Sequence, residues 1–225
     1  DRLVTDVNNA GDLKAKNAAQ AARQFREFYM KEIADRAAEL LDGNFLVRLN
    51  AVILLSELTV QSGDSRLGTA DEPFVDAYVP LVAVVEDKDQ PEAVKVHAVK
   101  GLARICQYGK PIASIKIKIG KALTSELKRK DSHFWYQMRL AEAIGTVDLT
   151  LDLDRKPFLA QALMEALVDT SRHCVVRSEA ARSLGRITLD TDVNVPLIAY
   201  EVAGLANEIA DRQIAESQAN DKSGI

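Results

Sequence analysis

Apolar residues recur at steps of three and four over most of the chain, which is the spacing of one face of an α-helix. The stretch 176–187 (V-R-S-E-A-A-R-S-L-G-R-I) shows this spacing, and related stretches lie at 47–58, 94–105 and 136–147. Their first residues are 47, 42 and 40 positions apart. Such spacings are typical of repeats made of two helices. The pattern therefore predicts four repeats.

A second helical series precedes each of these stretches. These series cover 18–40, 74–85, 112–127 and 158–167, and the last three begin near Pro73, Pro111 and Pro157. Proline is tolerated in the first turn of a helix, where the amide that it lacks would be unpaired. We expect nine helices, arranged as four antiparallel pairs and one closing helix. The expected boundaries are 1–15 for an N-terminal extension, 16–61, 73–108, 111–147 and 156–189 for the repeats, 195–215 for the closing helix and 216–225 for a polar tail.

The later helix of each pair resembles a known repeat family. In three copies a basic residue follows the first apolar position, and in three an Asp lies five positions before that position. These residues are Arg48, Lys95 and Arg177, with Gln137 departing, and Asp42, Asp89 and Asp131, with Ser171 departing. Together with paired small residues and a large apolar residue followed by a small one, this pattern resembles HEAT repeats and the similar armadillo-type repeats. The resemblance covers residues 16–215 and implies a single all-α domain, a right-handed α-solenoid of about four antiparallel helix pairs plus a closing helix.

Small residues recur on one stripe of these later helices. They predict close approach of neighbouring repeats, because a helix pair cannot bury its apolar face alone. We expect Gly185→Leu to overpack such a contact and to lower the free energy of unfolding by about 1–3 kcal/mol. The stripe comprises Ala51, Ala98, Ala141, Ala181, Ser56, Ala103, Gly145 and Gly185.

Composition narrows the functional classes. The chain of 225 residues is 47% hydrophobic with a net charge of −4, which is ordinary for a globular protein and argues mildly against a dedicated nucleic-acid binder. No apolar run approaches the ~20 residues that a membrane span needs. Cys106 and Cys174 are expected to be buried free thiols, which favours a reducing compartment such as the cytoplasm but does not identify one.

Catalytic motifs are not found in the sequence. We see no phosphate-binding glycine loop, no G-x-S-x-G and no H-E-x-x-H, so we predict no catalytic residue, cofactor or metal. His133 and His173 occupy equivalent turns, where we expect them to cap helices. Asp148, Asp152 and Asp154 lack the glycine and closing glutamate of a calcium loop. An enzyme on a HEAT-like scaffold remains the third hypothesis, although Trp135 is the only tryptophan and is expected to anchor the core.

The resemblance implies that the later helices line a concave binding surface. Its expected side chains include five basic and three acidic residues, which suits an acidic or phosphorylated segment of another protein. We therefore predict a non-enzymatic protein-binding scaffold or adaptor, whose partner could equally be the remainder of a longer parent chain. The expected binding residues are Asn50, Glu57, His97, Lys100, Arg104, Arg139, Glu142, Glu179, Arg182 and Arg186.

A basic run supports a second hypothesis, a nucleic-acid or phosphate-binding module. Against a single Glu126, the run holds Lys110, Lys116, Lys118, Lys121, Lys128, Arg129 and Lys130. Two polar connections, 61–72 and 148–155, are longer than stacked helices require and are further candidate contact points.

Overall fold

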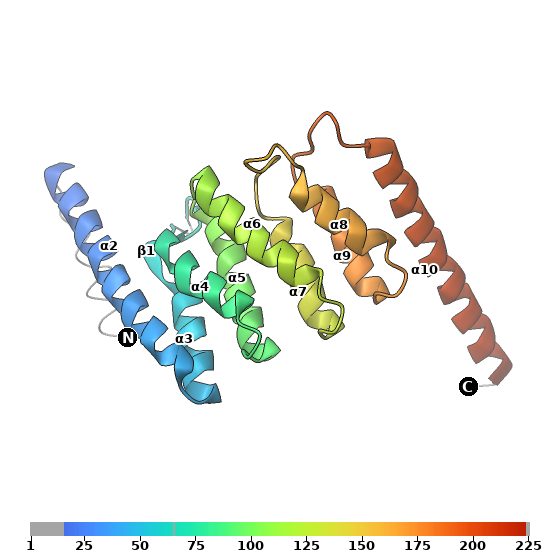
Figure 1. Ribbon diagram of the computed structural model, residues 1–225, viewed down its shortest axis with the longest axis horizontal. Coiled ribbons are helices and arrows are strands. Elements are labelled where there is room, and N and C mark those ends of the chain that lie inside the picture. The colour runs from blue at the N-terminus through green and yellow to red at the C-terminus, as the bar shows by residue number, and fades with distance from the viewer. Residues whose placement is uncertain (1–15, 65, 224–225) are drawn as a thin grey trace. The chain divides into compact units, whose positions relative to one another are not determined.

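The computed structural model describes residues 16–64 and 66–223 of the chain. Over this range the protein has nine α-helices, two short 3-10 turns and one small antiparallel sheet, so the prediction of a mostly helical fold is confirmed (Figure 1). The helices are α2 (Lys16–Glu39), α3 (Phe45–Glu57), α4 (Tyr78–Glu86), α5 (Glu92–Tyr108), α6 (Ala113–Leu127), α7 (Phe134–Ile144), α8 (Phe158–Val168), α9 (Cys174–Leu184) and α10 (Val195–Ser223); the strands are β1 (Thr59–Gln61) and β2 (Glu72–Pro73), and the 3-10 turns are Leu40–Asp42 and Val75–Ala77. The predicted extension 1–15 lies outside the described residues.

The chain divides into two compact units, with the boundary inside α6. Unit 1 runs to Leu123 and unit 2 begins at Thr124. In unit 1, α5 packs against both α3 and α4, and α4 lies in front of α5 in Figure 1. The core between these helices is formed by fully buried aliphatic side chains, including Val52, Leu55, Leu81 and Leu102.

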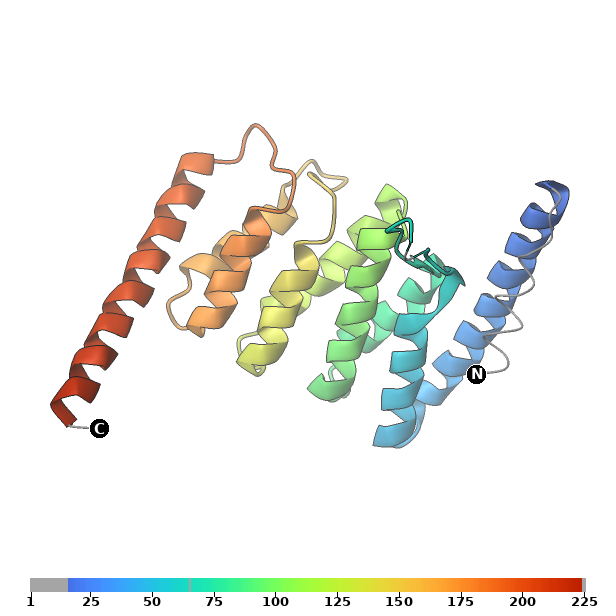
Figure 2. The same ribbon diagram turned by 180° about the vertical axis from the view of Figure 1, so that it is seen from behind.

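Unit 2 repeats this arrangement. Its helix α9 packs against both α7 and α8, and Figure 2 shows α7 (yellow) and α9 (orange) running side by side. Leu140, Ile144, Leu163 and Leu167 are wholly buried between them. Within each unit the later helix of a pair thus contacts its own partner and the later helix of the neighbouring pair, as stacked helix pairs require.

Small residues set the closest approach between neighbouring later helices. A methyl group on Gly101 of α5 would lie 2.7 Å from the Ser56 Cβ of α3, and one on Gly145 at the end of α7 would lie 2.8 Å from the Ser183 Cβ of α9. The two pairs occupy corresponding positions in the repeats of their own units. In the first repeat, Leu54 occupies the position that Gly101 and Ser183 occupy in theirs. Leu54 is exposed, because no earlier helix pair among the described residues packs against that position. Close packing through small residues is therefore confirmed at these two junctions.

The expected crowding at Gly185 is wrong. A methyl group there would meet only the Arg182 carbonyl oxygen, at 3.4 Å, and Gly185 is exposed. The reason is the position of each glycine. Gly145 faces α9, the later helix of the following pair, whereas the described residues contain no further helix pair after α9. Gly185→Leu is therefore no longer expected to overpack a junction.

The two-stranded sheet departs from the all-α prediction. It joins Thr59 to Pro73, and the Phe74 amide donates to the Leu58 carbonyl oxygen at 2.9 Å. Thr59 and Val60 are β-branched residues that favour extended backbone. Pro73 ends its strand, where a missing amide costs little. The long polar connection 61–72, named above as a candidate contact point, is thus closed at its base by backbone hydrogen bonds.

Helix α10 also extends further than predicted. It continues to Ser223 instead of ending near residue 215, because no proline or glycine interrupts 205–223. Leu205 is its one buried large apolar side chain in the described part, and it lies on the side that contacts α8 and α9.

Candidate functional site

The later helices of unit 2 carry an exposed aromatic side chain held by an arginine. Trp135, in the first turn of α7, is 48% exposed, so the prediction that it anchors the core is wrong. The Arg139 guanidinium lies one helical turn further along, with its central carbon 4.8 Å from the centre of the indole ring. The same guanidinium donates to a Glu142 carboxylate oxygen at 2.6 Å. The ring and the cation therefore restrict each other's position.

The positions of Arg139 and Glu142 on α7 correspond to Glu179 and Arg182 on α9, so the positive and negative charges are exchanged between the two helices. Glu179 corresponds to Arg139, and its carboxylate lies 3.4 Å from Arg182 and 3.7 Å from Arg186. The face of α7 and α9, together with the turn after α9, thus holds three arginines and two glutamates, and all five take part in ion pairs. We call Phe134, Trp135, Arg139, Val175 and Arg182, all on this face or at its N-terminal edge, the Trp135 surface.

Two histidines organise the edge of this surface. The Nδ1 atoms of His133 and His173 accept hydrogen bonds from the amides of Trp135 and Val175, at 3.2 and 3.3 Å. The predicted role of both histidines as helix caps is therefore confirmed. The exposed Phe134 ring lies between the two imidazoles, with centroid distances of 4.5 and 4.3 Å. The first turns of α7 and α9 are thus fixed side by side, and Trp135 projects from one of them.

The residues predicted as binding groups in unit 1 behave differently. Arg104 donates to the carbonyl oxygens of Ser56 and Leu58 at 3.2 and 3.1 Å, and to the Thr59 hydroxyl at 2.6 Å. Its guanidinium therefore supports the end of α3 and the start of β1 instead of facing a ligand. Asn50, Glu57 and Lys100 are exposed.

His97 completes the unit 1 set. Partial burial, together with the positive charge of Lys100, lowers the pKa of its imidazole below the usual value for histidine. A neutral imidazole beside a lysine offers no cationic contact for an acidic partner. Of the ten predicted binding residues, five lie on α7, α9 and the turn after α9 in unit 2, and the other five lie in unit 1.

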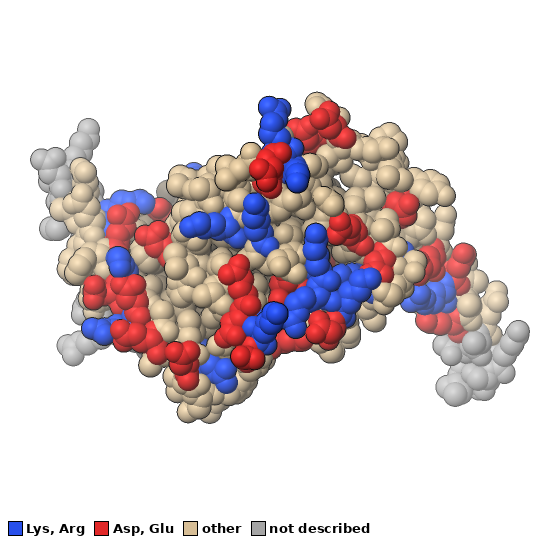
Figure 3. Space-filling model, viewed as in Figure 1, with Lys and Arg blue, Asp and Glu red and all other residues tan. Residues whose placement is uncertain are grey.

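The predicted basic run is divided between the two units. Lys110 lies in a turn with a positive φ of 49°, and Lys116, Lys118 and Lys121 follow on α6 in unit 1. The remaining three, Lys128, Arg129 and Lys130, form the turn after α6 in unit 2. Lys and Arg side chains gather over this end of α6, with Asp and Glu beside them, as Figure 3 shows.

Carboxylates accompany all the cations of that turn. Lys128 lies 3.8 Å from Glu165, Lys130 lies 2.7 Å from Asp169, and Arg129 lies 3.3 Å from Asp131 and 3.5 Å from Glu126. With Arg172, these residues form what we call the turn cluster. Four cations thus face four carboxylates, so an incoming phosphate would have to displace an ion pair that already exists.

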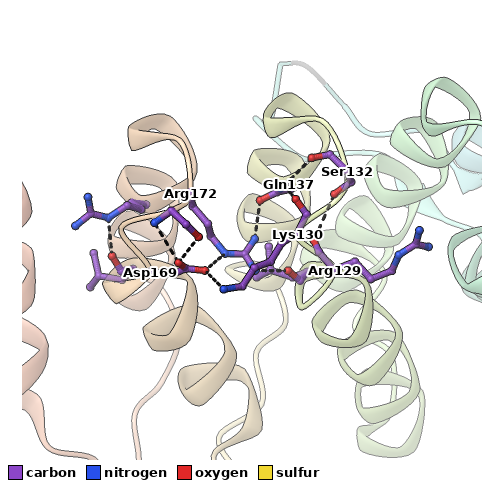
Figure 4. Close-up of polar contacts among 10 residues, drawn as sticks. Arg129, Lys130, Ser132, Gln137, Asp169 and Arg172 are labelled. Atoms are coloured by element: carbon purple, nitrogen blue, oxygen red, sulfur yellow. Dashed lines mark hydrogen bonds and ion pairs between the residues drawn. The ribbon is translucent and has the colours of Figure 1, made fainter.

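Arg172 joins three parts of unit 2 (Figure 4). Its guanidinium donates to the Gln137 side-chain oxygen at 2.6 Å and to the Leu127 carbonyl oxygen at 2.8 Å, and its Nε lies 3.3 Å from Asp169. Gln137 in turn donates to the Ser132 carbonyl oxygen at 2.6 Å. Gln137, which departs from the repeat pattern in sequence, therefore has a structural role, since a second cation could not accept from Arg172.

Asp169 has the most perturbed acidity of the turn cluster. The hydrogen bond from Lys130, followed by that from the Ser171 hydroxyl at 2.5 Å, holds the pKa of Asp169 far below its usual range. The open pocket beside it has a volume of about 420 Å³ and is lined by Lys128, Lys130, Glu165, Val168, Asp169 and Arg172. Its three cations are already paired with Glu165 and Asp169, so an anion that entered this pocket would have to displace existing ion pairs.

Other groups of potential chemical interest are held in structural contacts. Asp152 accepts from the amides of Asp154 and Lys156, both at 2.9 Å, and thereby closes its own loop. Burial raises the pKa of the Cys106 thiol to about 12, which suppresses its thiolate at neutral pH. In the described ranges 16–64 and 66–223, no three His, Cys, Asp or Glu side chains are arranged to hold a metal ion. No helix among them combines the length and apolarity needed to cross a bilayer.

Comparison with protein families finds no match for this chain, and comparison with curated proteins finds none either. The sequence did not predict that Trp135 is exposed at the surface, or that Arg172 bridges separate parts of unit 2. The available signal was the position of Trp135 in the first turn of a later helix, one residue before the apolar position that starts each copy.

Proposed function

We propose that this chain is a non-catalytic protein-binding module that holds its partner on the Trp135 surface. The observation that carries the proposal is the exposed indole of Trp135, which Arg139 holds in place. The first turn of the same helix is capped by His133, and its Phe134 ring stacks on His173. Tryptophan and arginine dominate the energetic centres of protein interfaces. Side chains that are already ordered lose less conformational entropy on binding.

The charge of the same face favours an acidic or phosphorylated segment. Arg182 is mostly exposed and is held only loosely by Glu179, at 3.4 Å. Three arginines against two glutamates leave the face of α7 and α9 with a positive excess. A partner carboxylate or phosphate near Arg182 would therefore gain a charge-assisted hydrogen bond.

We further propose that the helix pairs form a right-handed HEAT-like solenoid whose later helices line the concave side. The support is the repeated contact between small residues, Ser56 with Gly101 in one unit and Gly145 with Ser183 in the other. Similar junctions in both units are the expected result of one stacking rule applied along the chain. Small-angle X-ray scattering of the whole chain tests this, since a compact globule would contradict an extended curved array.

The binding proposal is tested by affinity capture from the native cell extract, with and without nuclease and at both low and high salt. Trp135→Ala is the test variant, and Leu153→Ala is the matched control, because Leu153 is an exposed apolar residue on a loop of the same unit. We expect a protein that binds the wild type and the control but not Trp135→Ala. A partner retained by Trp135→Ala would overturn the assignment of the surface, and recovery of nucleic acid that high salt removes would favour the phosphate-binding hypothesis instead.

A further inference from the structure

Two arginines at the end of α9 and in the turn after it share one carboxylate. The Arg182 guanidinium donates to one Glu179 carboxylate oxygen at 3.4 Å, and the Arg186 guanidinium lies 3.7 Å from the other oxygen. Within the described part of the chain, Glu179 is the acidic residue that pairs with both of them. A guanidinium has five N–H donors, so this one carboxylate engages few of the donors that the two arginines carry.

The three side chains differ in their access to solvent. The Glu179 side chain is 13% exposed, whereas those of Arg182 and Arg186 are 61% and 36% exposed. Glu179 thus lies largely beneath the two guanidiniums, and Arg182 presents its remaining donors to solvent. An incoming acidic group can therefore bind the exposed side of Arg182 without displacing Glu179. This distinguishes the site from the turn cluster, where carboxylates match the cations in number.

The balance of charge favours a group with a single negative charge. Arg139 and Glu142 form a close pair at 2.6 Å and cancel each other. Arg182 and Arg186 against Glu179 leave an excess of one positive charge. One carboxylate balances this excess, whereas a phosphate ester carries about −1.5 to −2 charges at neutral pH and would exceed it beside Glu179.

This charge lies close to the apolar part of the Trp135 surface. Trp135 and Val175 occupy corresponding positions in the first turns of α7 and α9, and they are 48% and 37% exposed. Arg182 follows Val175 by seven residues, which is about 10 Å along a helix. Its side chain reaches back by one turn to Glu179, so its guanidinium lies about 6–10 Å along the axis from the apolar pair. In an extended chain, side chains two residues apart point the same way and are about 7 Å apart.

We infer that the partner of the Trp135 surface is an extended segment with a large apolar residue and, two positions away, an Asp or Glu. The apolar side chain packs on Trp135 and Val175, and the carboxylate accepts hydrogen bonds from Arg182. The inference rests on the proposed function, because it specifies the chemistry of the segment that this surface holds. It selects a carboxylate, and not a phosphate, as the acidic group.

The test begins with a library of random twelve-residue peptides displayed on phage and selected on the full chain. We expect enriched peptides to share the apolar and acidic pair. An enriched peptide is then synthesised with Glu, Gln or phosphoserine at the acidic position. Affinity is measured from the NMR signal of the indole N–H of Trp135, the only tryptophan. Gln should weaken binding about two- to fivefold, as for exposed ion pairs, and phosphoserine should bind no more tightly than Glu.

Two variants change the charge of the site in opposite directions. Arg182→Gln removes the excess and leaves Arg186 with Glu179, so the Glu and Gln peptides should bind equally. Glu179→Gln doubles the excess, so the phosphoserine peptide should now bind more tightly than the Glu peptide. Arg212→Gln is the matched control, because Arg212 is an exposed arginine of the same unit that pairs with Glu208. It should retain the preferences of the wild type, and circular dichroism checks the folding of all three variants.

The possible failures are distinguishable. Enriched peptides that lose affinity for Trp135→Ala but bind Arg182→Gln as they bind the wild type would overturn the inference and leave the proposed function standing. Tighter binding of phosphoserine than of Glu to the wild type would also overturn the inference alone. Peptides that bind Trp135→Ala as well as the wild type, or a library without enriched peptides, would count against the proposed surface and the inference together.

Discussion

Gly145 and Ser183 lie so close that a methyl group on the glycine would approach the serine hydroxyl oxygen to 2.6 Å. This contact joins the C-terminal end of α7 to the last turn of α9 and fixes the spacing of the two helices there. The Ser183 hydroxyl is wholly buried and has no hydrogen-bond partner in the described structure. Close packing at this junction therefore leaves the buried Ser183 hydroxyl without a hydrogen bond in the described structure.

Replacing Gly145 by alanine should destabilise the protein. The added methyl group has no room beside the Ser183 backbone, so the helices must separate, and we expect a loss of about 1–3 kcal/mol in urea unfolding. Gly185→Ala is the matched control, because Gly185 has the same place at the end of α9 with right-handed helical dihedral angles and open surroundings. It should be neutral or stabilise by about 0.4–1 kcal/mol.

A double-mutant cycle sharpens this prediction. Ser183→Gly removes the side chain that the new methyl group would meet, so combining it with Gly145→Ala should cost less than the sum of the two single changes. Additive effects would show that Gly145 is required for its backbone conformation and not for close approach.

Asp169→Asn should loosen the turn cluster. The change leaves Lys130 and the buried Arg172 facing a neutral amide, and we expect a loss of about 1–3 kcal/mol at neutral pH. The wild-type carboxylate has a lowered pKa in the folded state, so its contribution is complete above the unfolded pKa, roughly 4. The contribution is lost as the pH falls further, towards the folded pKa.

The stability difference between the wild type and Asp169→Asn should therefore shrink below about pH 4. Urea unfolding of both proteins at several pH values measures this. Lys128→Gln is the control: its ion pair is exposed and 3.8 Å long, and such pairs contribute less than about 1 kcal/mol. A constant difference between wild type and Asp169→Asn at all pH values would contradict the assigned role of the carboxylate.

Arg104→Ala should open the small sheet locally. The guanidinium supports two carbonyl oxygens at the end of α3 and the Thr59 hydroxyl, and the alanine variant leaves these acceptors without that donor. Amide hydrogen exchange should accelerate at Phe74, whose amide bonds to one of the same carbonyl oxygens. Arg104→Lys should rescue little, since an ammonium cannot reproduce a planar fork that serves three acceptors.

The two cysteines should differ in their reaction with iodoacetamide. Cys106 is buried and its pKa is raised to about 12, so at pH 8 almost none of it is thiolate. Cys174 is half-buried at the start of α9 and should react first. Mass spectrometry of the partly labelled protein measures the order. Equal labelling of both cysteines in the folded protein would contradict the burial of Cys106.

The mostly helical fold could be predicted from the sequence because apolar spacing reports directly on burial. Val176, Ala180 and Leu184, which define the repeat pattern, are all buried as expected. The sheet was missed because three residues of strand carry little periodicity, and its hydrogen bonds join positions more than ten residues apart.

The candidate site was less predictable than the fold. Sequence could place Arg139 and Arg182 on the polar face of their helices, but it could not show that Arg104 is bound to backbone oxygens instead. Likewise, counting charges along the basic run overlooked Glu165 and Asp169, which reach the turn cluster from α8 and the residue following it. Ion pairing across separate helices depends on tertiary contacts, and a local pattern does not contain that information.

The contact of the Phe134 ring with both His133 and His173 has a consequence for how unit 2 unfolds. Each imidazole caps one helix while its ring rests on the same phenyl group, so the first turns of α7 and α9 are held by one shared element. Fraying of either helix from its first turn would remove the support of the other. These two turns should therefore open together as a single cooperative event, with equal opening free energies in native-state exchange.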